Sequence, residues 1–462
     1  MANAVYNLIP QLWFIGLTVF TTPFVLHRLG IDAYGILSII TIVAGYLAFL
    51  DLGFNLAIIK FIAAYDAQNE SGEINRVTQT ALSVFLLIAA VTTTALLCLS
   101  GLLAKLLNVP ESLQSEAATA LRLGAVSFGV NLLMGVFSAV PRALQRFDIV
   151  NLLSIVFGTL QIGGTVGLVA SGFGLTAVIG WSCGVSLLSL LIYMVVAKRL
   201  LPTLSMWPQF DRKKFRELFG FSSFVMVSNF TGVASANSEK LILAGLAPIA
   251  QVTFYTVPFN LVSRVLAFIP GNLYAVLFPV FSAMSVTDKR ETIQAAYVRV
   301  SKYIFLAVAP ITILLIAFGS ELLRLWLGDE MSRYGGPALA VLAVAVLVNA
   351  PAWVCVTVGQ SLGRPSLVSL AQVFHFATLV VCGLVFVPHY GALGAAIAWL
   401  AGNLIGIPIL MMLVNRYVLA FSTAKMLKEA FGRPVLAAAA VFLMAFAMKP
   451  LVHGWVSLAG AS

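Results

Sequence analysis

Four ionisable side chains fall inside long apolar runs of the sequence. Asp51 interrupts FLDLGFNLAIIKF, Glu239 and Lys240 adjoin one another in NSEKLILAGL, and Arg264 lies within the run from 252 to 284. If these runs cross a membrane, each charge costs roughly 2.5–3.5 kcal/mol on insertion scales. Such a charge needs a partner, water or a function, so these residues are the first candidates for a binding site.

Arg264 is the strongest of these candidates because of its depth. It lies twelve residues into its run, or ~18 Å at ~1.5 Å per residue, which is near the middle of a bilayer. A guanidinium there could bind phosphate through two parallel hydrogen bonds. The alternative is a structural ion pair with a carboxylate such as Asp51 or Glu239.

The other charges each have two interpretations. Glu239 and Lys240 close an apolar run, so they either face a cavity or reach the membrane surface by snorkelling. Asp51 lies nine residues before Lys60, about 13–14 Å deeper at ~1.5 Å per residue in a helix. We interpret Lys60 as an anchor at the end of its run. Asp51 is expected to partner a cation or a coupling ion, or else to serve helix packing.

Three further ionisable residues are weaker candidates. Arg28 and Arg122 fall near the ends of their runs, where they bind substrate or act as ordinary interfacial anchors. His375 lies in the middle of a run and could relay protons, but a single histidine there more often has a packing role.

The elements that position these side chains are predicted to be membrane-spanning helices. The 462 residues are 61% hydrophobic and only 10% charged, and the mean hydropathy of +1.01 is beyond that of water-soluble domains. Thirteen runs, from 7–27 to 430–449, approach or exceed the ~20 residues that a spanning helix needs. The runs 33–62 and 252–284 are longer, so we expect them to be tilted, broken or projecting. We therefore predict an all-α polytopic membrane protein.

The basic residues indicate an orientation and exclude a nucleic-acid partner. The net charge is +10, but nineteen of the 27 Lys and Arg residues fall at loops on one side of the predicted topology, and seven on the other. The positive-inside rule then places the N-terminus in the cytoplasm. No metal-ligand spacing, nucleophile with a base, or P-loop is found, and the four cysteines lie singly in apolar runs. We predict neither catalysis, nor a cofactor, nor a metal site.

The most polar connection divides the chain into two bundles. We predict an N-terminal bundle at 1–199, a cytoplasmic basic linker at 200–216, a C-terminal bundle at 217–420 and an additional helix with tail at 421–462. The linker interleaves aromatic and basic residues: Trp207, Phe210, Arg212, Lys213, Lys214, Phe215 and Arg216. It either lies on an anionic leaflet or is a solvated segment that enforces topology.

An internal repeat supports this division. An offset of 218 aligns Trp181 with Trp399 and Asn131 with Asn349, without a gap, from the fourth to the sixth run and from the tenth to the twelfth. Because six runs separate equivalent positions, the halves share one orientation. The expected fold is two parallel six-helix bundles around a central cavity.

Three segments carry a resemblance to a known family. PFVLHRLGIDAYGILSI, GYLAFLDLGFNLAIIKFIAAY and YGALGAAIAWLAG occur in an order and spacing that resemble the polysaccharide transporter family, within the superfamily of MATE drug exporters. The family pattern has twelve or fourteen spans, so the thirteenth run at 430–449 is a departure. If that helix crosses, the C-terminus lies outside.

The resemblance implies a function. Members of the family are flippases of the bacterial inner membrane. By alternating access they move undecaprenyl-diphosphate-linked oligosaccharide from the cytoplasmic to the outer leaflet. The oligosaccharide is then used to assemble a surface polysaccharide such as O-antigen. Expected partners are this lipid-linked oligosaccharide, membrane lipids, H⁺ or Na⁺ as coupling ion, and a polysaccharide polymerase and glycosyltransferases. The main rival is a MATE-like cation-coupled multidrug antiporter, which would present carboxylates and aromatic rings instead of Arg and Lys. A membrane scaffold for glycan assembly enzymes is a third alternative, for which neutralising Arg264 would be harmless.

Overall fold

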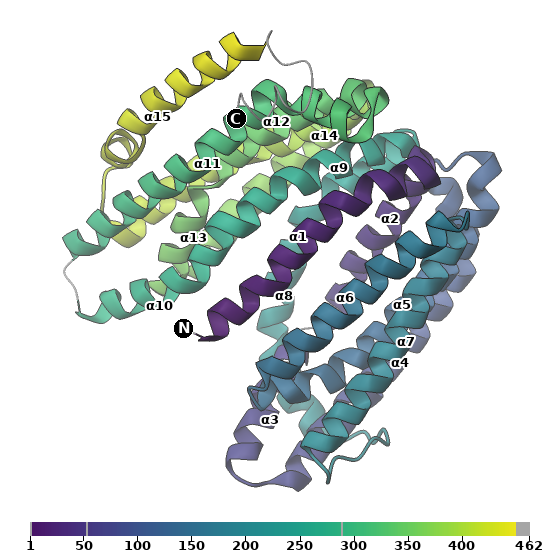
Figure 1. Ribbon diagram of the computed structural model, residues 1–462. Helices are drawn as coiled ribbons and strands as arrows, with labels where there is room; N and C mark the ends of the chain where they lie inside the picture. Colours follow the sequence, from purple (N-terminus) through teal and green to yellow (C-terminus); the bar gives the residue numbers. More distant parts are fainter. Residues whose placement is uncertain (1, 52–53, 288–289, 450–462) are drawn as a thin grey trace. The chain divides into compact units, whose positions relative to one another are not determined.

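The computed structural model describes residues 2–51, 54–287 and 290–449, and these residues form helices and short connections without a strand (Figure 1). This confirms the all-α prediction. Within the described ranges, nine helices are long and apolar enough to cross a membrane. Contacts divide the chain into two compact units, Met1–Val233 and Ala234–Ser462. The protein is a multi-pass membrane protein.

The N-terminal unit is built on α5, which packs against α4, α7 and α3. Its helices are α1 (Ala2–Leu29), α2 (Ile31–Leu47), α3 (Phe54–Ala67), α4 (Ser71–Leu106), α5 (Glu111–Ala143), α6 (Phe147–Ala170), α7 (Leu175–Leu200) and the first part of α8 (Arg212–Leu246). Phe54, Ile58 and Ile62 recur at every fourth position of α3 and are fully buried. That spacing places them on one face of the helix, where Phe54 meets Phe85 of α4 edge to face at 6.1 Å.

The long run 33–62 is broken inside the N-terminal unit. The α-helix α2 ends at Leu47, a 3₁₀ turn covers Ala48–Asp51, and α3 begins at Phe54. The prediction that this run is tilted, broken or projecting is therefore confirmed, and Asp51 lies at the break.

The C-terminal unit is organised around α12, which packs against α11, α14 and α9. Its helices are the end of α8, then α9 (Ile249–Leu266), a π-helical segment (Ala267–Gly271), α10 (Asn272–Thr287), α11 (Arg290–Leu327), α12 (Asp329–Asn349), α13 (Ala352–Ser361), α14 (Pro365–Val414), a second π-helical segment (Asn415–Leu419) and α15 (Thr423–Met448). The long run 252–284 is thus also interrupted, at the segment that contains Pro270.

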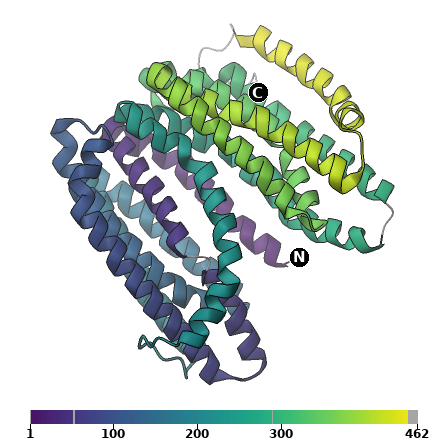
Figure 2. The same cartoon turned by 180° about the vertical axis from the view of Figure 1, so that it is seen from behind.

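Helix α14 is a hairpin of two antiparallel lengths (Figure 2). Gly391 has φ +52° and ψ −124° and reverses the chain. Beyond it, Ala398 returns past Gly383, and Gly402 and Gly406 return past His375. Small residues that let helix backbones approach closely are typical of membrane interfaces. The two lengths correspond to the predicted runs 366–388 and 391–415.

The hairpin of α6 and α7 has the same register as the α14 hairpin. Gly164 of α6 lies against Trp181 of α7, and Gly383 lies against Ala398. When the repeat offset of 218 is subtracted, Gly383 and Ala398 correspond to positions 165 and 180 of the α6–α7 hairpin. In antiparallel packing, 165 with 180 is the pair next to 164 with 181. The packing therefore agrees with the repeat found in the sequence.

Helix α15 runs parallel to α11 along one side of the C-terminal unit. Phe431 of α15 meets Phe305, near the middle of α11, with ring centroids 5.4 Å apart. Lys449 Nζ lies 3.7 Å from Glu321 Oε1 near their ends. The 16 residues from 305 to 321 span about 24 Å of helix, so the contact extends over most of a bilayer core. Exposed Leu436, Leu443 and Phe446 suit contact with lipid.

Candidate functional site

The most deeply buried acidic side chain is that of Glu239, near the end of α8. It is 0% exposed. Tyr255 Oη of α9 donates a hydrogen bond to Glu239 Oε1 at 3.2 Å, whereas Oε2 has no hydrogen-bond partner within the described ranges. A buried carboxylate oxygen without a donor is costly unless a proton or a cation binds it. The burial favours an interior position over snorkelling, and it leaves capacity for one positive charge.

Lys240 continues this cluster beside an aromatic ring. Its side chain is buried, Nζ donates to Asn237 Oδ1 at 3.0 Å, and Nζ lies 4.2 Å from the centre of the Phe259 ring. The π face of an aromatic ring attracts a cation at this distance. Phe259 also stacks on Tyr255 with centroids 5.6 Å apart, so the two sequence candidates share one polar and aromatic environment.

A chain of contacts extends from this cluster through the C-terminal unit; all of its links join side chains except that from Asn403 Nδ2 to the Trp399 carbonyl oxygen. Phe259 meets Trp399 edge to face at 5.5 Å. The chain continues through Trp399, Asn403, Asn349, Trp353, Tyr274 and Gln360. Its shortest link is the hydrogen bond from Asn349 Nδ2 to Asn403 Oδ1, at 2.6 Å. We call these residues, with Glu239, Lys240, Tyr255 and Phe259, the C-terminal polar network.

Sequence reasoning missed most of this network. Asn349 entered only as a repeat position, and Asn403 was not noted. The available signal was polar and aromatic residues four positions apart within apolar helices, as in Asn349 with Trp353 and Trp399 with Asn403.

Arg264 is exposed on α9, one turn before the π-helical segment. It forms no ion pair with a carboxylate in the described part of the chain, so the pair with Glu239 is not formed. The segment Ile249–Gly271 is a candidate membrane span, and π-helical turns are frequent at functional sites. Arg264 is thus an exposed guanidinium within a candidate span.

Asp51 ends the 3₁₀ turn of the N-terminal unit and is half-buried. Asn55 Nδ2 donates to Asp51 Oδ2 at 3.4 Å, across the break between α2 and α3. Asn55 in turn lies close to Gly135 of α5. The Asp51 carboxylate therefore lies at the break in the run 33–62 and is bound there by Asn55.

Arg28 and Arg122 occupy different surroundings in the N-terminal unit. Arg28 lines a pocket of about 370 Å³ together with Asp32, Glu116 and Phe173. Arg122 Nε of α5 donates to Ser100 Oγ of α4 at 3.0 Å, a contact that ties two helices together. Arg122 thus contacts a neighbouring helix, whereas Arg28 lines a pocket.

His375 packs between the two lengths of α14. A Cβ added to Gly406 would lie 2.6 Å from His375 Cβ, and one added to Gly402 would lie 3.0 Å from the His375 carbonyl oxygen. This close fit favours the packing role over proton relay.

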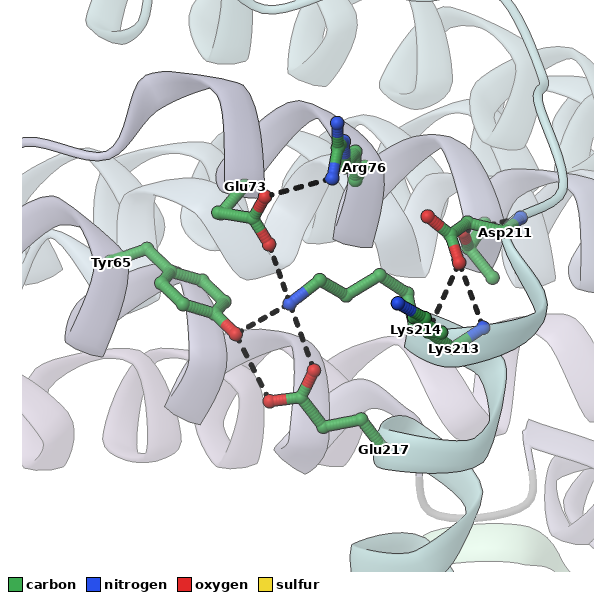
Figure 3. Close-up of polar contacts among 8 residues, drawn as sticks. Tyr65, Glu73, Arg76, Asp211, Lys213, Lys214 and Glu217 are labelled. Carbon is green, nitrogen blue, oxygen red and sulfur yellow. Dashed lines mark hydrogen bonds and ion pairs between the residues drawn. The ribbon is translucent and has the colours of Figure 1, made fainter.

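Charged groups gather where α3, α4 and α8 of the N-terminal unit meet (Figure 3). Lys214 Nζ lies 2.7 Å from Glu73 Oε2, 2.9 Å from Glu217 Oε2 and 2.6 Å from Tyr65 Oη. Burial opposes the charge of Lys214, but the hydrogen bonds with Glu73, Tyr65 and Glu217 raise its pKa above the ordinary value. The hydrogen bond from Lys214 lowers the pKa of Glu73. The cluster, missed from sequence as a unit, is held in its charged form.

Asp211 completes this arrangement at the start of α8. Its Oδ1 accepts hydrogen bonds from the backbone N–H groups of Lys213 at 2.8 Å and Lys214 at 3.2 Å. The hydrogen bond from the Lys214 N–H, followed by that from Lys213, lowers the pKa of Asp211. Capping of this kind satisfies free N–H groups at a helix start. Within the described ranges, no group of three or more His, Cys, Asp or Glu residues could hold a metal ion.

Comparison with known proteins identifies the family. A family model described as "Polysaccharide biosynthesis protein" matches residues 25–335, which is more than half of the chain. The protein belongs to this polysaccharide biosynthesis family. A curated relative, the putative O-antigen transporter of Shigella flexneri, is 24% identical over 404 residues, covering 86% of this chain and 93% of the relative.

Solved structures show that the fold is similar to that of MATE transporters and of a lipid flippase. An inward-facing MATE multidrug resistance transporter superposes with a TM-score of 0.74 at 14% identity, covering 87% of this chain and 94% of that structure. The lipid II flippase MurJ, in an inward closed conformation, superposes with a TM-score of 0.69 at 15% identity, covering 97% and 98%. The family and the MATE-like fold that the sequence motifs predicted are confirmed.

Proposed function

We propose that the protein is a flippase that carries undecaprenyl-diphosphate-linked oligosaccharide from the cytoplasmic to the outer leaflet of a bacterial inner membrane. Membership of the polysaccharide biosynthesis family supports export of a glycan, and the helical transporter fold supports translocation by alternating access. A polymerase and glycosyltransferases would act on the product and supply the substrate. The observation that carries the proposal at the site is the exposed Arg264 within a candidate span.

The substrate's charge explains why Arg264 is needed. A lipid diphosphate carries its negative charge into a medium that solvates ions poorly, and a guanidinium compensates it through parallel hydrogen bonds. Hydrogen bonds to charged groups are worth about 1.5–3 kcal/mol. Loss of this contact therefore slows transport by about 10-fold to 100-fold, since 1.4 kcal/mol corresponds to a factor of ten.

Glu239 is our candidate for coupling to an ion gradient. Its unpartnered Oε2 accepts one proton, or contributes to binding of one Na⁺, at a buried position. Tyr255 holds the other oxygen, so the carboxylate has a fixed orientation when the ion arrives. Asp51 is a second carboxylate candidate, in the N-terminal unit.

A cation-coupled multidrug antiporter is the second candidate function. The buried carboxylate of Glu239, surrounded by the rings of Tyr255 and Phe259, favours it. The same environment contains Lys240, which repels a cationic drug. The exposed Arg264 adds to this repulsion, and we therefore rank the flippase first.

The decisive experiment is gene deletion followed by analysis of lipid-linked oligosaccharide in each leaflet. The flippase proposal expects accumulation of inside-facing lipid-linked oligosaccharide, restored to normal by the wild-type gene and by Arg264→Lys in part, but not by Arg264→Gln. Arg299→Gln, which removes an exposed charge near the start of α11, is the matched control and should complement fully. Normal lipid distribution together with increased drug sensitivity would replace the flippase by the antiporter.

A further inference from the structure

The linker, residues 200–216, is fixed to the start of α4 rather than hanging free. Asn75 binds it on both sides, since Nδ2 donates to the Thr203 carbonyl at 2.9 Å and Oδ1 accepts from the Ser205 N–H at 2.7 Å. Gln79 Nε2, one turn further along α4, donates to Ser205 Oγ at 2.9 Å. These contacts hold the linker against α4 at Thr203 and Ser205, so the linker residues that come after Ser205 start from a fixed position on the N-terminal unit.

The acidic groups around the linker are occupied by internal contacts. Asp211 caps the first turn of α8, and Glu73 and Glu217 both bind the buried Lys214 (Figure 3). Lys214 is therefore a structural cation, unlike its neighbours. The charge that the linker presents outward is positive.

The outward charge comes from Arg212, Lys213 and Arg216. All three side chains are exposed, and none forms an ion pair with a carboxylate in the part of the chain that the structure describes. The first five residues of α8 thus include three exposed cations that form no ion pair within the described ranges.

Two aromatic side chains stand beside these cations. Trp207 is 81% exposed and Phe210 is 56% exposed. Phe210 is supported from behind by Phe215, with ring centroids 5.5 Å apart, and Phe215 in turn contacts the buried Phe54 at 6.1 Å. Exposure of two large rings to water is unfavourable, whereas the interface between lipid headgroups and acyl chains accommodates both their apolar faces and the indole N–H.

We propose that the linker is an interfacial binding surface for anionic phospholipid, with Trp207 and Phe210 inserted at headgroup level and Arg212, Lys213 and Arg216 bound to headgroup phosphates. The combination of aromatic anchors with clustered cations is what an anionic leaflet attracts. The location follows from the positive-inside orientation, which places the linker at the cytoplasmic leaflet. This surface shares no residue with the proposed transport site and does not depend on which substrate is carried.

The test uses the full-length protein in lipid nanodiscs made of phosphatidylcholine alone or of equal parts phosphatidylcholine and phosphatidylglycerol. Brominated acyl chains quench tryptophan at shallow membrane depth, and the difference between wild type and Trp207→Phe isolates the Trp207 signal from the other six tryptophans. We expect Trp207 to be quenched, and several-fold more strongly when phosphatidylglycerol is present.

Two triple variants of equal charge locate the effect. Arg212→Gln/Lys213→Gln/Arg216→Gln should abolish the phosphatidylglycerol dependence of Trp207 quenching. Lys425→Gln/Lys428→Gln/Arg433→Gln, which removes three exposed charges from α15, should leave it unchanged. An unquenched Trp207 in both lipids would mean that the linker is solvated and serves topology only. Equal loss in both triple variants would mean that net charge, not the linker surface, attracts the lipid. Either result overturns the proposal.

Discussion

Gly391 makes the turn of the α14 hairpin, and replacing it with alanine should destabilise the C-terminal unit. Its φ of +52° with ψ of −124° is a conformation that side chains oppose. An added Cβ would also collide with Gln251 Oε1. That oxygen accepts a hydrogen bond from the Ala392 N–H at 2.9 Å. It therefore caps a backbone N–H at the start of the second half of α14.

The expected magnitude combines two costs. A strained backbone conformation costs about 1–3 kcal/mol, and displacement of the Gln251 hydrogen bond costs about 0.5–1.5 kcal/mol more. Gly391→Ala should therefore lose about 1.5–4.5 kcal/mol. At about 2–4 °C per kcal/mol for a unit of this size, the apparent Tm in detergent should fall by roughly 3–18 °C.

The assay is thermal unfolding of the purified protein, with two controls. Gly432→Ala lies in a regular, open part of α15 with no atom near its added Cβ, so it should leave the Tm unchanged or raise it slightly. Gln251→Ala removes the collision and the hydrogen bond together. The double variant Gly391→Ala/Gln251→Ala should then lose less than the two single variants summed. A Gly391→Ala protein as stable as wild type would refute the reasoning.

Three further predictions concern charge and topology. The pKa values of Glu73 and Asp211 are lowered in the folded state, so the stability that these carboxylates contribute is present at neutral pH and lost as the pH falls below their usual pKa values of about 4. Hydrogen exchange of the linker amides should accelerate in that pH range beyond its intrinsic pH dependence. Unchanged protection down to pH 2 would contradict this. Replacing Glu239 with Gln should reduce ion-driven transport more than tenfold while substrate binding persists. Tyr255→Phe should reduce ion-driven transport by a smaller factor. Full activity of Glu239→Gln in a gradient-dependent vesicle assay would show that Glu239 does not couple transport to the ion gradient. Helix α15 runs parallel to α11, so we expect α15 to cross the membrane and Lys449 to lie outside the cytoplasm. Alkaline phosphatase fused after Lys449 should then be active, and a fluorescent protein at the same site should be dark. The reverse pattern would show that α15 does not cross.

The sequence was a good guide to the fold because lipid allows few solutions. Apolar length predicted the helices, and excess length predicted that the run 33–62 is tilted, broken or projecting. The predicted boundary between the last two runs of the repeat lies within three residues of Gly391. The repeat offset even predicted equivalent hairpins. These features depend on local composition, which a single sequence displays directly.

The candidate site was harder to predict because partners come from distant helices. Lys214 was indistinguishable from Lys213 in sequence, although one is buried among two carboxylates and the other is exposed. Likewise, nothing near Glu239 in the sequence indicated Tyr255 as its donor. Charge in an apolar run shows that a partner is needed, but only the packing of helices shows which side chain supplies it.

The matching registers of the two hairpins have a consequence for how this protein acquired its asymmetry. A duplicated ancestor would have placed the same residue at each pair of positions 218 apart, and the present chain records where the copies diverged. Asn349 still has its counterpart in Asn131, which donates to Ser186 Oγ at 3.1 Å. The positions matching Asn403 and His375, however, are the buried Val185 and Phe157. At these two positions the C-terminal half is polar where the N-terminal half is apolar, so the two hairpins share a backbone register but differ in interior chemistry.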